Sequence, residues 1–116
     1  MSKFTRPAML AGSWYPGTEI GLKNTIEDCF LSEFGPGELP VPKKADASHD
    51  VIGIISPHAG FRFSGGVAAN GYHAICQAGI PDTIILVASH GGYDNIFIQT
   101  EGKWETPLGN LEIDSD

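Results

Sequence analysis

Hydrophobic residues in the first third of the chain recur at helical spacing. After Thr18, a residue type that favours the N-cap position, apolar side chains follow every three or four residues. They are Leu22, Ile26, Cys29, Phe30 and Phe34. Gly35-Pro36-Gly37 then interrupts the pattern. The segment therefore predicts an amphipathic helix that starts after Thr18 and ends near Phe34.

Two uninterrupted apolar runs follow, at 51–55 and 83–88. Their β-branched residues are typical of strands that are buried on both faces of a parallel sheet. Between them lie a Gly-rich loop over 56–66 and a second helical pattern from Val67, with Gly79 as its expected C-cap. Strand, helix and strand together predict a βαβ unit with a right-handed crossover.

The last part of the chain predicts only short strands. Residues 95–100 and the segment around 103–105 are expected to pair as a hairpin, and Thr106-Pro107-Leu108-Gly109 reads as a turn. Neither a third helix nor a further strand follows the turn. The predicted fold class is α/β, with a partial central sheet, one βαβ unit and flanking helices. We expect a single, incomplete domain over residues 1–116.

Composition narrows the function classes. With 41% hydrophobic and 18% charged residues, the chain is expected to fold rather than to be intrinsically disordered. A net charge of −7 and scattered Lys and Arg disfavour nucleic acid as a partner. No apolar run approaches the roughly 20 residues of a membrane helix, and no signal segment is visible, so we expect a cytoplasmic protein without membrane contact. Cys29 and Cys76 are expected to be buried free thiols.

Two histidines stand just after the two predicted strands. His58 follows the first strand by three residues, and His90 follows the second. Because the carboxyl ends of neighbouring parallel strands meet at one edge of a sheet, both rings are expected there. Neutral imidazole is a good ligand for iron, zinc or copper. The positions therefore predict that His58 and His90 are two ligands of a mononuclear metal site, and they are also the candidate catalytic residues.

Alternatives stay open at this point. Each histidine, taken singly, is better explained as a loop residue hydrogen-bonded to a nearby carbonyl, and only the matched positions of the two favour a metal site. A third metal ligand is needed, and the in-chain candidates Asp94, His73 and Glu101 have no compelling spacing. His49 lies in a polar connection and is expected to be solvated. A catalytic serine is disfavoured because no G-x-S-x-G motif is present.

Aromatic side chains follow the first histidine in sequence and also occur near the N-terminus. Trp14, Tyr15, Phe61 and Phe63 are candidates to line an apolar pocket in which an aromatic or peptide-like ligand stacks. The competing interpretation is that they are ordinary core aromatics. Trp14, Tyr15 and Phe61 are the predicted pocket residues.

Four ordered motifs resemble one family. They are Ala11-Gly12-Ser13-Trp14-Tyr15-Pro16, Pro57-His58-Ala59-Gly60-Phe61 with Ser64-Gly65, Ser89-His90, and Trp104-Glu105-Thr106-Pro107-Leu108-Gly109. In this order they closely resemble the Memo-like family, also known as the B component of the AmmeMemoRadiSam system. That family is similar in fold to the class III extradiol ring-cleaving dioxygenases.

The resemblance implies an α/β fold with a redox-active metal, iron or copper, at the strand ends. His58 and His90 match two of the family's metal-binding positions, and the remaining ligands, a later histidine and a cysteine, come from a region that this chain lacks. Cys29 and Cys76 do not match that cysteine. Gly91 replaces a second polar residue that the family often has after Ser-His. The chain resembles only the first portion of full-length relatives.

Three functional hypotheses follow. The leading one is a metal-dependent, dioxygenase-like oxidoreductase that acts on a small or aromatic substrate, with His58 or His90 moving protons. The second is a peptide- or phosphopeptide-binding module that needs no metal. The third is a fragment that self-associates or requires a complementing chain, because an unfinished sheet exposes strand edges.

Overall fold

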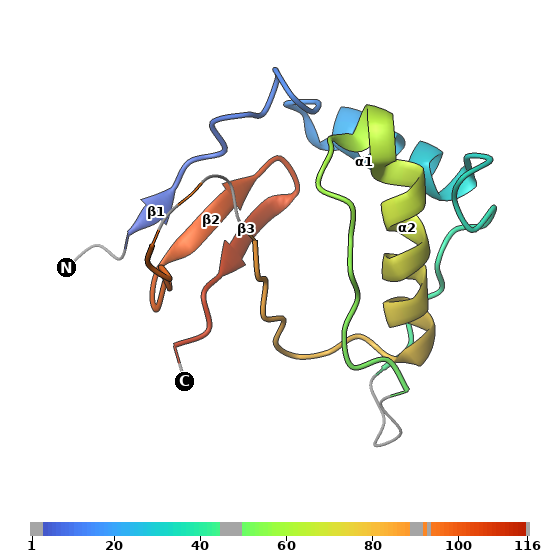
Figure 1. Ribbon diagram of the computed structural model, residues 1–116. Coiled ribbons are helices and arrows are strands. Elements are labelled where there is room, and N and C mark those ends of the chain that lie inside the picture. The colour runs from blue at the N-terminus through green and yellow to red at the C-terminus, as the bar shows by residue number, and fades with distance from the viewer. Residues whose placement is uncertain (1–3, 45–49, 89–91, 93, 116) are drawn as a thin grey trace.

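The computed structural model describes residues 4–44, 50–88, 92 and 94–115. It contains the helices α1 (Glu19–Leu31) and α2 (Phe61–Ala78) and the strands β1 (Thr5–Arg6), β2 (Lys103–Thr106) and β3 (Gly109–Glu112). The two helices pack against each other on one side of the molecule, and the small sheet lies on the other (Figure 1). The chain therefore has the predicted α/β class.

Helix α1 confirms the first helical prediction. Thr18 is its N-cap, and the side-chain oxygen accepts a hydrogen bond from the backbone N–H of Gly21 at 3.2 Å. In the first two turns, Lys23 Nζ pairs with Glu19 Oε1 at 2.6 Å. The helix ends at Leu31, three residues before Phe34, where the Ser32 hydroxyl donates to the Cys29 carbonyl.

Helix α2 begins at Phe61, so the prediction that 61–66 belong to a loop is wrong. Gly65 and Gly66, which indicated a loop, instead allow the two helices to approach each other closely. A Cβ atom at Gly65 would collide with Cys29 Sγ, and one at Gly66 would collide with the Ser32 hydroxyl. Glycine here allows α2 to pack closely on the end of α1. The predicted C-cap is confirmed, since Gly79 has φ 118° and its N–H donates to the Ile75 carbonyl.

The sheet is built from the two ends of the described chain. β1 pairs parallel with β2, and β2 pairs antiparallel with β3 around the predicted turn at 106–109. The guanidinium of Arg6 lies 4.2 Å from the ring centroid of Trp104, which adds a cation–π contact between β1 and β2. The predicted hairpin partner was wrong, because residues 109–112 and not 95–100 pair with β2.

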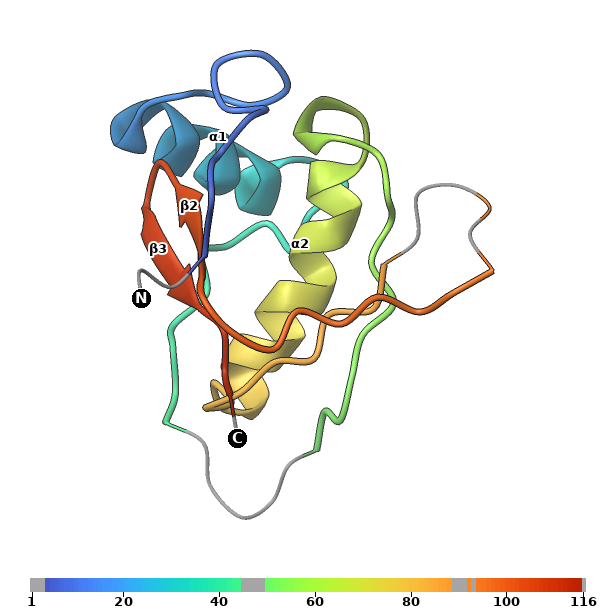
Figure 2. The same cartoon turned by 90° about the vertical axis from the view of Figure 1, so that its left-hand side faces the viewer.

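The two apolar runs predicted as buried strands are not strands in the structure. Residues 51–55 and 83–88 carry no strand assignment, and the first run passes alongside α2 (Figures 1 and 2). Ile54 packs on Gly71 of α2, whereas Ile52 and Ile55 are fully exposed. A doubly buried strand needs hydrogen-bonded neighbours, and the described residues provide none for either run. The predicted βαβ unit is therefore present only as its helix and two unpaired flanking segments.

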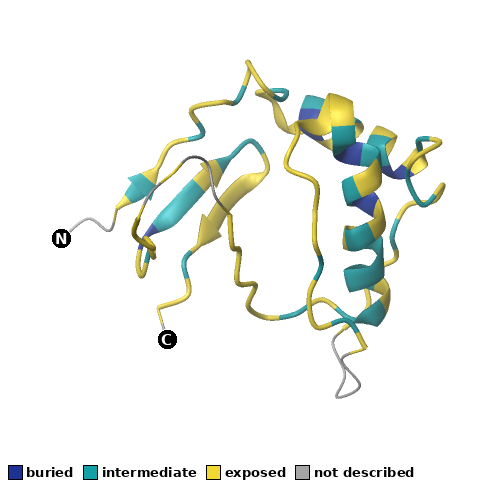
Figure 3. Cartoon of the chain, viewed as in Figure 1, coloured by how far each residue is buried: buried dark blue, intermediate teal, exposed yellow. Residues whose placement is uncertain are grey.

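The core is confined to the contact between the helices. Leu22, Phe30 and Ala69 are the apolar residues that are buried among those described, and exposed surface dominates elsewhere (Figure 3). The accessible surface is 9470 Å², compared with about 6,100 Å² for a compact monomer of 12.3 kDa.

Neither of the described helices combines the length and apolar character that crossing a membrane requires.

Candidate ligand pocket and histidine loop

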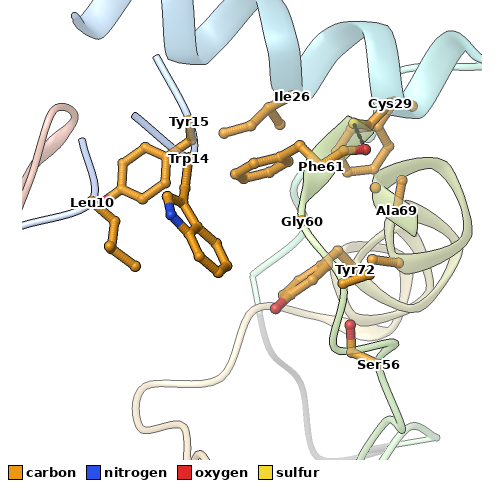
Figure 4. Close-up of a pocket in the computed structure, with 14 residues that line it drawn as sticks. Leu10, Trp14, Tyr15, Ile26, Cys29, Ser56, Gly60, Phe61, Ala69 and Tyr72 are labelled. Atoms are coloured by element: carbon orange, nitrogen blue, oxygen red, sulfur yellow. Dashed lines mark hydrogen bonds between the residues drawn. The ribbon is translucent and has the colours of Figure 1, made fainter. Parts of the chain in front are cut away.

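An apolar pocket of about 250 Å³ opens between the N-terminal aromatic segment and the two helices (Figure 4). Its walls come from residues 10–15, from α1, from the loop at 56–60, and from the first three turns of α2. Its lining includes the side chains of Trp14, Tyr15, Cys29, Phe61 and Tyr72. The three predicted pocket residues, Trp14, Tyr15 and Phe61, thus lie together around one cavity.

Tight turns hold the aromatic segment in place. The N–H of Trp14 donates to the Leu10 carbonyl at 2.9 Å, and the N–H of Gly12 donates to the Tyr15 carbonyl at 2.8 Å. Tyr15 then meets the ring of Phe61 edge-on, with centroids 6.4 Å apart and planes at 74°. Trp14 remains 70% exposed. A large aromatic face is therefore available to a ligand at the mouth of the pocket.

Cys29 forms part of the pocket wall as a protonated thiol. Its Sγ lies 3.9 Å from the Phe61 carbonyl, within the sulfur hydrogen-bond range. Burial raises the pKa of the Cys29 thiol above its ordinary value, and the neighbouring negative charge of Asp28 adds to the increase. Both cysteines are free and half-buried. The prediction that both thiols are free is confirmed, whereas the prediction that they are buried is only partly met.

His58 stands in the loop that leads into α2. Ser56, Ala59 and Gly60 of this loop line the pocket, and His58 itself is exposed beside it. Ser64 fixes the end of the loop by donating to the Ala59 carbonyl at 2.8 Å. His90 lies outside the described residues, as does His49, so the predicted pairing of His58 and His90 stays a prediction.

The described residues offer an incomplete donor set for a metal. Across 4–44, 50–88, 92 and 94–115, no three His, Cys, Asp or Glu side chains gather as a metal would require. The candidate third ligand His73 lies on α2, where its Nε2 atom is buried 3.2 Å from Glu38 Oε1 without a hydrogen bond to it. Asp94 and Glu101 are exposed. Of the two predicted ligands, only His58 lies among the described residues, and a single donor does not hold an ion.

A second cavity of about 580 Å³ shares Trp14, Tyr15 and Phe61 with the first. It also includes Arg62, which places a permanent cation next to the aromatic residues. Sequence reasoning missed both Arg62 and Tyr72. The signal for Tyr72 was present, because residues 61, 65, 68, 69 and 72 have the spacing of one helix face. The loop assignment of 61–66 concealed it.

Comparison with known proteins identifies the class. The family model for "Memo-like protein" matches residues 6–116, so the chain belongs to the Memo-like family. It is 40% identical over 113 residues to a MEMO1 family protein of Methanopyrus kandleri and 42% identical over 113 residues to one of Methanothermobacter thermautotrophicus. A MEMO1 family protein of Sulfurisphaera tokodaii is 41% identical over 107 residues. No solved structure matches the chain significantly.

The relatives are much longer than this chain. The Methanopyrus and Methanothermobacter matches each cover 96% of this chain but 39% of the relative, and the Sulfurisphaera match covers 90% and 38%. The chain thus spans about two fifths of the length of these curated relatives. Activities, substrates and partners of the whole protein are therefore matters for proposal.

Proposed function

We propose that this chain contributes His58 and His90 to the mononuclear iron or copper site of a Memo-like oxidoreductase. The remaining ligands would come from the portion of the family that this chain does not span. The apolar pocket beside His58 would receive a small or aromatic substrate. The observation that carries the proposal is the shared loop: residues that line the pocket flank His58 on both sides.

The pocket suits an aromatic or apolar substrate. Its volume of about 250 Å³ accommodates a small ring, and its walls are mostly aromatic and aliphatic. Trp14 and Tyr15 would stack on the substrate and exclude water from it. The neutral Cys29 thiol adds no charge to this wall. The metal, when bound, would supply the redox chemistry.

Metal binding tests the proposal directly. We expect the wild-type chain, titrated with Cu²⁺ or with Fe²⁺ under anaerobic conditions, to bind one ion per chain weakly, through His58 and His90 with water in the remaining positions. His58→Ala and His90→Ala should each lower the affinity at least tenfold, since either change removes one of two ligands. His73→Ala is the matched control and should leave affinity unchanged, because His73 lies within α2 and not in the loop that carries His58. Equal binding in all four proteins, or no binding in any, would contradict the proposal.

A second candidate function is recognition of a peptide, including a phosphopeptide, without metal. The position of Arg62 favours it, because a guanidinium beside Trp14 and Tyr15 fits a phosphorylated aromatic side chain. Calorimetry with tyrosine and phosphotyrosine peptides in excess EDTA distinguishes the two functions. Under this second hypothesis Trp14→Ala abolishes binding, Arg62→Gln removes the preference for phosphate, and Trp104→Phe has no effect. Metal-independent binding with this pattern would replace the first proposal.

We further propose a cytoplasmic location, as the sequence predicts.

A further inference from the structure

We infer that Ser64 of α2 is a positioning residue for His58, because its hydroxyl ties the loop that carries this histidine to the start of the helix. The role rests on the proposed function, in which His58 is a metal ligand beside the pocket. Ser64 itself contacts neither metal nor substrate in this role. It acts on His58 through the backbone of the residues between them.

Ser64 makes two hydrogen bonds to the peptide groups that follow His58. Its Oγ atom donates to the Ala59 carbonyl at 2.8 Å, and its backbone N–H donates to the Gly60 carbonyl at 3.1 Å. Both distances lie in the normal range for hydrogen bonds of these types. One residue of the helix therefore holds two consecutive carbonyl groups, and the first of them belongs to the residue next to His58.

The entry to α2 lacks the side-chain cap that usually fixes the path of the preceding chain. Gly60 is the N-cap residue and provides no side-chain hydrogen bond, whereas Thr18 caps α1. Glycine permits wider backbone rotation than other residues, and a Cβ atom added at Gly60 would meet nothing within 4 Å. Gly60 by itself thus leaves the direction of the loop free, and the hydroxyl bond from Ser64 restricts it.

The hydroxyl of Ser64 reaches outside its own helix. Serine and threonine hydroxyls within helices commonly bond to the carbonyl three or four residues earlier. The hydroxyl of Ser64 instead donates to Ala59, which lies five residues earlier and before the N-cap. Serine is also a poorer helix former than alanine, so helix formation alone does not favour it at position 64. The contact with the loop gives a reason for the serine.

The restrained loop is also part of the pocket wall. Ala59 and Gly60 line the cavity. Gly60 leads directly into Phe61, the first residue of α2, whose ring stands in the pocket (Figure 4). His58 precedes these residues and is exposed beside the cavity. Holding the loop at Ala59 therefore keeps His58 at the edge of the pocket and reduces the conformational entropy that the loop loses when His58 binds an ion.

Two substitutions at position 64 separate the effect of the hydroxyl from that of the helix. Ser64→Ala removes the donor, whereas Ser64→Thr keeps it, because a threonine hydroxyl in a helix can bond toward the preceding carbonyls. Asn70→Ala is the matched control. Asn70 Nδ2 also donates from α2 to a loop carbonyl at 2.8 Å, but that carbonyl belongs to Phe34 and lies outside the histidine loop.

The first measurement uses the metal-free chain in EDTA. Nuclear magnetic resonance relaxation gives the backbone order parameters of Ala59 and Gly60. We expect values of about 0.85 in the wild type, Ser64→Thr and Asn70→Ala, and values that approach about 0.6 in Ser64→Ala. Order parameters that stay at the wild-type value in Ser64→Ala, or that fall equally in Ser64→Thr, would overturn the positioning role.

Titration with Cu²⁺ then relates the loop to its histidine. Ser64→Ala should bind Cu²⁺ about three- to tenfold more weakly than the wild type, the effect of one lost hydrogen bond, and Ser64→Thr should bind within about twofold of it. Asn70→Ala should match the wild type. If the wild type binds copper through His58 and Ser64→Ala binds equally well, the positioning role is wrong and the proposed function stands. If the wild type binds no copper, the proposed function is wrong, and the positioning role with it.

Discussion

The helix pair and the two unpaired runs contain similar apolar side chains, yet only the helix pair buries them. Leu22 and Phe30 of α1 are 5% and 8% exposed, whereas Ile52 and Ile55 are fully exposed. The difference lies in what each element needs from the rest of the chain. A helix satisfies its own backbone and needs one apolar neighbour, but a strand needs neighbours at its edges as well as on its faces. α1 and α2 bury each other's apolar faces. The two runs have no such neighbours among the described residues.

Removing the largest core side chain should break the helix pair. Phe30→Ala is expected to lower the free energy of unfolding by about 3–5 kcal/mol, because it empties the centre of the small core. Urea denaturation followed by circular dichroism measures the loss. Phe63→Ala is the matched control: Phe63 is 81% exposed on α2, and its change should stay within about 0.5 kcal/mol. Equal losses would show that the core lies elsewhere.

The close approach of α2 to α1 should depend on Gly65 and Cys29 together. In the wild type, Gly65→Ala is expected to destabilise by about 1–3 kcal/mol, because the new Cβ meets Cys29 Sγ. In a Cys29→Ala background that obstacle is gone, and the same change should stabilise by up to about 1 kcal/mol through helix propensity. A double-mutant cycle in urea measures the coupling. Additive effects would contradict the predicted contact.

The start of α1 should depend on the side chain of Thr18. Thr18→Ala is expected to cost about 1 kcal/mol, because the Gly21 N–H loses its acceptor. Thr18→Asn should keep most of the stability, since asparagine is also a good N-cap. Thr100→Ala, at an exposed position outside the helices, is the control. If Thr18→Asn proves as damaging as Thr18→Ala, capping is not the cause.

The raised pKa of Cys29 should give the helix pair a small alkaline sensitivity. The thiol ionises at higher pH in the folded chain than in the unfolded chain, so the stabilisation is complete below the unfolded pKa. It is lost as the pH rises through the folded pKa. Stability measured across this alkaline range should therefore fall less in Cys29→Ala than in the wild type.

Changes in the unpaired runs should have the smallest effect on the free chain. Ile55→Ser is expected to change its unfolding free energy by less than about 0.5 kcal/mol, because Ile55 makes no buried contact. Ile54→Ser, in the same run, should cost more, since Ile54 packs on Gly71. Denaturation of both variants measures the contrast. Equal and large losses would mean that the run is already part of a buried sheet.

Features fixed by local chemistry were predicted from the sequence. The N-cap Thr18, the C-cap Gly79 and the turn at 106–109 depend on neighbouring residues, and all three are confirmed. The start of α2 was missed because Gly65 and Gly66 are needed for close packing against α1, which is distant in sequence. For the same reason the partner of β2 was wrong: strand pairing depends on contacts that no local pattern encodes.

The candidate site also has parts that the sequence predicted and parts that depend on distant contacts. The aromatic residues Trp14, Tyr15 and Phe61 were predicted to line a pocket, and they do lie around one cavity. Tyr72 was missed because it joins them only once α2 begins at Phe61. The metal-binding role of His58 and His90 stays a prediction, since it depends on the edge where two strands would meet. The pocket is built on the packed helices and is present in the structure. The histidine site depends on the two runs, which are unpaired among the described residues.

Amide hydrogen exchange of the free chain tests the central contrast most directly. We predict slow exchange for the amides of α1 and α2 around Leu22, Phe30 and Ala69, and exchange close to the unprotected rate for 51–55 and 83–88. Protection of the two runs equal to that of the helices, in a chain shown to be monomeric, would mean that their strands are already paired and would contradict the account.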